Sequence, residues 1–135
     1  MAQSANESWT SFRATVSIGS YRVVAHAATT GTEVLLVNTV TTIPLGICQD
    51  NVSTGDAAPI ALPGSRAKAI CGASVSAGAV LGHDTAGAVI EVTGGNEYQS
   101  LTGTAIARRV GLSLMAGSTN AVIDILVQPE MIRFL

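Results

Sequence analysis

The sequence is short of charged and aromatic residues, and these shortages narrow the kind of protein that it encodes. Charged residues make up 12% of the 135 positions and aromatic residues 4%, whereas hydrophobic residues make up 47%. Typical soluble domains carry about 25% charged residues. A surface with so little charge favours contact with other protein subunits, so we expect an assembly component; a small alanine-rich monomer is the alternative.

Basic runs, long apolar runs and a secretory leader are also missing. The seven basic and nine acidic residues are scattered and give a net charge of −2, which argues against a nucleic-acid partner. The most apolar stretch, residues 34–49, is interrupted by Asn, Thr and Pro, so we expect no membrane span. The first residues, MAQSANESW, lack the basic and then hydrophobic order of a signal peptide, which predicts synthesis in a cytoplasm.

Residues that carry catalysis or bind metals are few and dispersed. There are two histidines and two cysteines: His26, His83, Cys48 and Cys71. They lack the close spacing of a zinc site, and the apolar surroundings of both cysteines favour buried free thiols, with a disulfide left open. His83 precedes Asp84 and the turn TAG, which indicates a surface loop rather than a catalytic dyad. We therefore predict that the protein is not an enzyme and has no metal and no cofactor.

Short β-forming segments do fill the sequence, separated by glycine-containing breaks about every ten residues. Gly31 marks a hairpin, and the loop DNVSTGD has too few acids for a calcium site and indicates a turn. Residues 103–117 alternate in part and predict a strand, with a short helix as the alternative. The predicted fold class is all-β: a small β-barrel or β-tulip-like domain, residues 21–135, preceded by an extended N-terminal arm, residues 1–20.

One motif occurs twice. Residues 45–62, LGICQDNVSTGDAAPIAL, align without a gap on residues 110–127, VGLSLMAGSTNAVIDILV, and Gly46 then matches Gly111. In each copy a glycine lies between apolar residues, as where a strand bends, and a polar turn leads to a second strand. We expect two corners of the barrel-like sheet to be built alike; chance similarity of turn-rich sequence is the alternative.

The order of these short motifs resembles that in the small capsid decoration (cement) proteins of tailed bacteriophages. The segments are SYRVVAHAATTGTEV, then residues 45–92, then VGLSLMAGSTNAVIDILV, and the resemblance covers about residues 21–128. They share a hydrophobic-Gly-hydrophobic strand, a Gly-Asp turn at Gly55 and Asp56, and later Ala-Gly turns. The second copy departs from this pattern because Asn120 and Ala121 replace the Gly-Asp pair.

The resemblance implies a domain that binds the outer surface of a phage head and stabilises contacts between major capsid subunits. It implies a virion protein, made in the host cytoplasm, whose partners are the major capsid protein and further copies of itself, with a trimer favoured over a dimer. The family offers no cofactor and no catalytic residue. The alternative is a β-rich host- or carbohydrate-binding module displayed on a virion; a small hydrolase would need a histidine beside a cysteine in space.

The two ends of the chain carry the predicted contact residues for the capsid or a neighbouring subunit. Trp9, Phe12 and Arg13 lie in the polar arm, where an isolated tryptophan needs a pocket, and the apolar tail adds Met131 and Phe134. Basic residues elsewhere are candidates for pairing with acidic patches of a partner, namely Arg22, Arg66, Lys68, Arg108 and Arg109. Solvated surface charge is the alternative for each of them.

Overall fold

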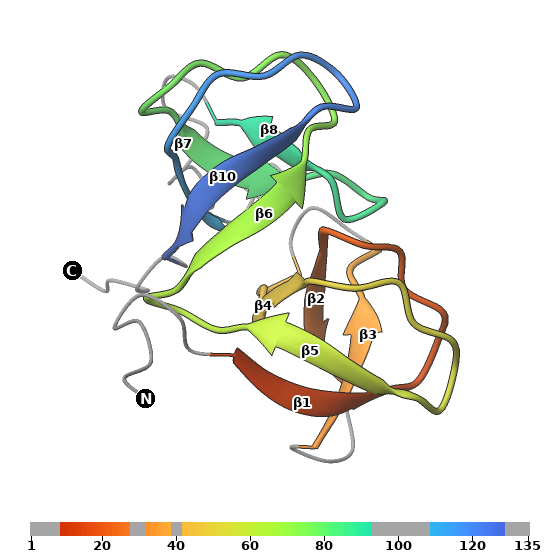
Figure 1. Ribbon diagram of the computed structural model, residues 1–135. Helices are drawn as coiled ribbons and strands as arrows, with labels where there is room; N and C mark the ends of the chain where they lie inside the picture. Colours follow the sequence, from red (N-terminus) through yellow and green to blue (C-terminus); the bar gives the residue numbers. More distant parts are fainter. Residues whose placement is uncertain (1–8, 28–31, 39–41, 93–108, 129–135) are drawn as a thin grey trace, which may run out of the picture.

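The computed structural model describes residues 9–27, 32–38, 42–92 and 109–128, and all regular structure in these ranges is β-strand. The strands form two groups that follow each other along the chain (Figure 1). The predicted all-β class with a small β-barrel of short strands is therefore confirmed.

The first five strands form a closed barrel, which we call the first unit. They are β1 (Trp9–Ala14), β2 (Arg22–His26), β3 (Glu33–Leu36), β4 (Gly46–Cys48) and β5 (Ala57–Ala61). Their order around the barrel is β1-β3-β2-β4-β5, and β5 pairs back on β1. Small and β-branched side chains fill the narrow interior, which contains Ala14, Ile18, Val24, Val34, Cys48, Ala58 and Ile60. The scarcity of aromatic residues fits so thin a core.

The next five strands form a second sheet, which we call the second unit. They are β6 (Arg66–Ile70), β7 (Val80–His83), β8 (Val89–Glu91), β9 (Gly111–Ser113) and β10 (Val122–Val127). Their order is β6-β10-β9-β7-β8. In β10 buried and more exposed residues alternate, as expected for a strand with one face on a core.

The second unit repeats the first strand by strand. In β4 and β5, Ile47 pairs with Ala61, and in β9 and β10, Leu112 pairs with Leu126. These are the positions that the gapless alignment of the repeated motif superimposes, so the two similar corners are confirmed. The match extends further: the parallel pairing of β1 with β3 recurs as a parallel bridge between Cys71 and β8. The chain is therefore an internal duplication of one five-stranded unit.

The second unit is left open where the first is closed, and the first unit fills the opening. The Ile70 N–H donates to the Tyr21 carbonyl at 3.1 Å, and the Val23 N–H donates to the Gly87 carbonyl at 2.8 Å. The start of β2 thus lies between β6 and β8. As a result, one buried cluster joins the outer face of the first unit, including Ile47 and Ala61, to the interior of the second.

The expected boundary between arm and domain at residue 20 differs from this architecture. Residues 9–14 are strand β1, which pairs with β5 along its length and so belongs to the barrel. The polar, aperiodic sequence of this segment gives no sign of the partner strand that it finds far along the chain. Residues 1–8 of the expected arm lie outside the described residues.

Candidate functional site

Groups able to bind a metal do not converge in the part of the chain that the structure describes, because no three His, Cys, Asp or Glu residues there could hold an ion together. Over the same ranges, no helix has the length and apolar character needed to cross a bilayer. Cys48 and Cys71 are both buried and free, as predicted. Burial raises the pKa of each thiol, and the Cys48 thiol donates to the Asp50 carbonyl at 3.1 Å.

The prediction that His83 lies in a surface loop is wrong. His83 ends strand β7 and is fully buried. Its Nε2 lies 2.9 Å from the Thr42 carbonyl of the first unit, and its Nδ1 lies 3.0 Å from the Asp84 carbonyl. Asp84 caps the following turn by accepting the N–H groups of Ala86 and Ala88. The pair is therefore structural, and His83 joins the two units.

His26 occupies the same place in the first unit that His83 occupies in the second, because the two histidines pair with Val34 and Val89 in equivalent registers. The environments differ, however, since His26 is exposed and makes an edge contact with Phe12 at a ring separation of 5.9 Å. The sequence alone does not reveal this difference, because it depends on which face the neighbouring unit covers.

The predicted contact residues fall into two groups. Trp9, Phe12 and Arg13 lie on β1, where Phe12 packs against the first core and the exposed Arg13 side chain lies 3.6 Å from Glu33. Met131 and Phe134 lie outside the described residues. Of the five residues, the structure thus describes only the three on β1, and the capsid or subunit contact expected of the five stays a prediction.

The outer face of the second unit carries a three-residue ion cluster that spans β6 and β10. Lys68 Nζ lies 3.1 Å from Asp124 Oδ1, and Arg66 Nη2 lies 3.2 Å from Asp124 Oδ2. The hydrogen bond from Lys68, and then that from Arg66, lowers the pKa of Asp124. Alternation in the sequence indicates that each of these side chains points outward, but the pairing itself requires the register of the two strands.

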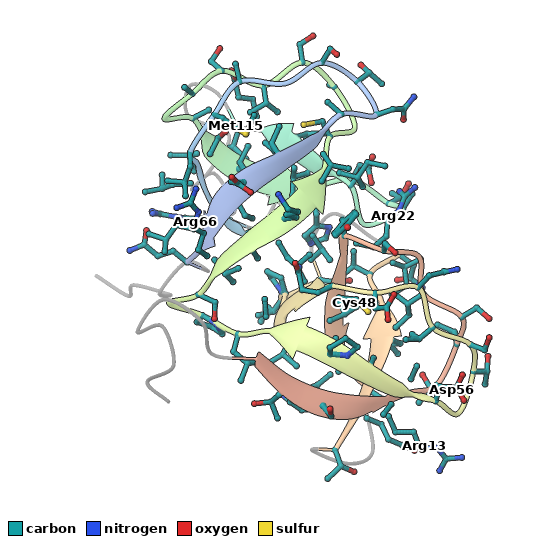
Figure 2. The ribbon with its side chains drawn as sticks, in the orientation of Figure 1. Arg13, Arg22, Cys48, Asp56, Arg66 and Met115 are labelled. Atoms are coloured by element: carbon teal, nitrogen blue, oxygen red, sulfur yellow. The ribbon has the colours of Figure 1, made fainter. Side chains whose placement is uncertain are left out.

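Leu114 and Val122 bring exposed apolar side chains close to Asp124 of this ion cluster. Leu114 and Met115 follow β9, Val122 begins β10, and each exposes more than two fifths of its surface. Figure 2 shows Met115 and Arg66 on the second unit, in the upper and left parts of the view, and Asp56 on the first unit at the lower right. This outer face, with its apolar rows and excess of basic side chains, is the best candidate for a functional surface.

Comparison with known proteins adds a likeness of fold. No protein-family model and no curated protein matches the chain. Among solved structures, the chain is similar to the head fiber gp8.5 N base of bacteriophage phi29, with a TM-score of 0.66 and 16% identity. The match covers 93% of this chain and 98% of that chain, so both units are included.

Proposed function

We propose that the chain is a structural protein of a bacteriophage virion, which binds the outer surface of the head and stabilises contacts between major capsid subunits. The observation that supports this most is the likeness of nearly the whole chain to the N base of a phage head fiber. The order of motifs, which resembles that of capsid decoration proteins, points to the same particle surface independently of the fold.

The physical character of the surface agrees with a binding role. A protein that stabilises a shell needs contact area and many symmetric copies, because weak contacts repeated over a particle add up to high avidity. The outer face of the second unit offers apolar area around Leu114 and Val122, together with the basic heads of Arg66 and Lys68. On this proposal the chain is made in the host cytoplasm and acts on the virion, with the major capsid protein and further copies of itself as partners, a trimer being favoured over a dimer.

A second candidate is the base that attaches a longer fibre to the head. The likeness to the phi29 structure favours it, because that chain is the N base of a head fiber. The two candidates differ in their effect on the capsid. A cement protein makes the shell more resistant to rupture, whereas a fibre base binds the shell without strengthening it.

Heads that lack the protein can separate these possibilities. Purified chain is added to them, bound copies are measured by co-sedimentation, and the temperature of DNA release is recorded. Saturable binding with a higher release temperature supports the cement role. Saturable binding without a change in release temperature supports the fibre base, and no binding at saturating concentration contradicts both.

The predicted contact residues of the two chain ends stay part of this proposal. Removing residues 1–8 leaves β1 whole and so tests the arm without breaking the barrel. We expect this deletion, and separately the exchange Met131→Ser with Phe134→Ser, to reduce the number of copies bound to heads. Circular dichroism of each variant serves as the folding control, and full occupancy by both variants would show that residues 1–8 and the side chains of Met131 and Phe134 are not contacts.

A further inference from the structure

The outer face of the second unit carries apolar side chains on four strands. Ile70 pairs with Val122, Leu126 pairs with Leu112, and Leu112 pairs with Val80. All of these side chains are half-buried or exposed. Two apolar rows therefore cross this face, one over β6 and β10 and one over β10, β9 and β7, and Asp124 of the ion cluster lies between them on β10.

In the first unit, the residues equivalent to three residues of this face are buried against the other unit. The equivalents of Val80, Leu112 and Leu126 are Val23, Ile47 and Ala61, which follow from the matching registers. All three of these residues are completely buried beneath the second unit. In the first unit this row thus already forms the contact with the other unit of the chain, and the second unit presents the same row uncovered.

The charge of this face indicates the charge that a binding partner must carry. The side chains of Arg66 and Lys68 expose 58% and 56% of their surface, whereas Asp124 exposes 25% and accepts from both. Two cations against one anion leave an excess of one positive charge in the ion cluster. A complementary surface is therefore acidic with an apolar centre.

The far end of the first unit carries an excess of acidic side chains, because the exposed arginine that the structure describes there, Arg13, pairs with Glu33. Asp50 and Asp56 are exposed on the β4–β5 hairpin, and neither forms an ion pair with another residue that the structure describes. Val16, exposed by 42%, lies in the loop that the Ile18–Val52 bridge holds against this hairpin. In Figure 2, Arg66 lies on the left side of the second unit and Asp56 at the lower right of the first unit, so the two surfaces of one molecule do not meet each other.

We propose that the outer face of the second unit binds the acidic end of the first unit in a second copy of this chain. The contact joins two different surfaces, so it is head-to-tail and produces a closed ring when the rotation between copies closes. This inference deepens the proposed function by naming the subunit contact, and it rests on that function only for the expectation that copies assemble.

Charge exchange between the two surfaces tests the contact. Sedimentation velocity over a range of concentrations gives the mass of the full chain and of Lys68→Glu, Asp56→Lys and the double variant. We expect wild type to form an oligomer and each single variant to associate about tenfold more weakly. The double variant restores opposite charges across every head-to-tail contact, so its association should return to within about threefold of wild type.

Two exchanges of an exposed apolar residue for glutamine, one on the proposed contact surface and one away from it, provide a matched test and control. Leu114→Gln installs the residue that the first unit carries at the equivalent position, Gln49, and should weaken association about tenfold as well. Ile43→Gln is the control, because Ile43 is more exposed than Leu114 and lies on neither surface. It should leave the mass unchanged.

Three results would overturn the proposal: a wild-type monomer at every concentration, an oligomer indifferent to Lys68→Glu and Asp56→Lys, or single variants that lose binding to heads while keeping the wild-type mass. The last result would assign the face to the capsid shell. Association without binding to heads, in contrast, would support this contact and reject only the proposed virion function.

Discussion

At the residue scale, the two thiols give the most direct test of the core. Cys48 and Cys71 are buried, and burial raises the pKa of each, so little reactive thiolate is accessible in the folded chain. We expect a thiol reagent to label native protein at least about tenfold more slowly than protein in urea. The measurement is the absorbance change with an aromatic disulfide reagent at neutral pH.

The control for this labelling is the same protein in urea, where both cysteines should react at the rate of a free peptide thiol. Immediate reaction of both thiols in the native state would contradict their place in the two cores. Failure of either thiol to react in urea would reveal a disulfide, which the structure does not contain.

At the element scale, the repeated hairpin depends on one glycine in each copy. A Cβ at Gly46 would overlap the Ala61 carbonyl oxygen, and a Cβ at Gly111 would overlap the Leu126 carbonyl oxygen. We expect Gly46→Ala and Gly111→Ala each to lower the free energy of unfolding by about 1–3 kcal/mol, because the backbone of the partner strand must move. Urea denaturation measures both.

Gly19→Ala is the matched control for these two variants. A Cβ there would meet the Arg22 side chain at 3.7 Å, which is ordinary contact, so stability should stay within about 0.5 kcal/mol of wild type. Equal losses of unfolding free energy at all three positions would contradict this account. They would show that replacing any glycine destabilises the protein, whether or not a strand approaches it closely.

The same scale shows why the sequence predicts the hairpin repeat but not the whole duplication. The hairpins share recognisable residues, whereas other equivalent positions keep only their backbone conformation. Tyr21 and Gly78 match in the registers and have φ values of 66° and 82°, and Gly55 and Asn120 match with 91° and 69°. A residue with positive φ can be Gly or Asn and is occasionally of another type. The residue identities of the two copies therefore differ, whereas the conformation of the turn is the same.

The candidate surface was predictable only in part, for a related reason. Alternation in β6 and β10 indicates that Lys68 and Asp124 point outward, and the structure confirms this. Their pairing, and the burial of His83, depend on contacts between segments far apart in the sequence. Periodicity reports which face a residue takes, but it does not report what covers that face.

At the scale of the whole molecule, one of the contacts between the two units is made by the Gln49 side chain, which hydrogen-bonds to the edge of β6 as a neighbouring strand would. The Gln49 amide donates from Nε2 to the Lys68 carbonyl at 3.0 Å and accepts the Lys68 N–H on Oε1 at 3.2 Å. Gln49→Ala removes both bonds at the open edge of β6, and we expect a loss of about 1–2 kcal/mol in the free energy of unfolding.

Asn51→Ala, in the same hairpin, is the control and should be close to neutral because its side chain is exposed. The buried cluster spans both units, so wild type and Gln49→Ala should each unfold in one transition that circular dichroism and tryptophan fluorescence report together. Two separate transitions in wild type would mean that the units are independent domains.

The claim that the chain serves on the outside of a virion is tested most directly by where it is found. The measurement is quantitative mass spectrometry of purified particles before and after digestion with a protease that cannot enter an intact head. The account predicts many copies per particle and their loss on digestion, with the packaged DNA still protected. Absence of the chain from purified particles, or its full survival inside digested ones, would contradict it.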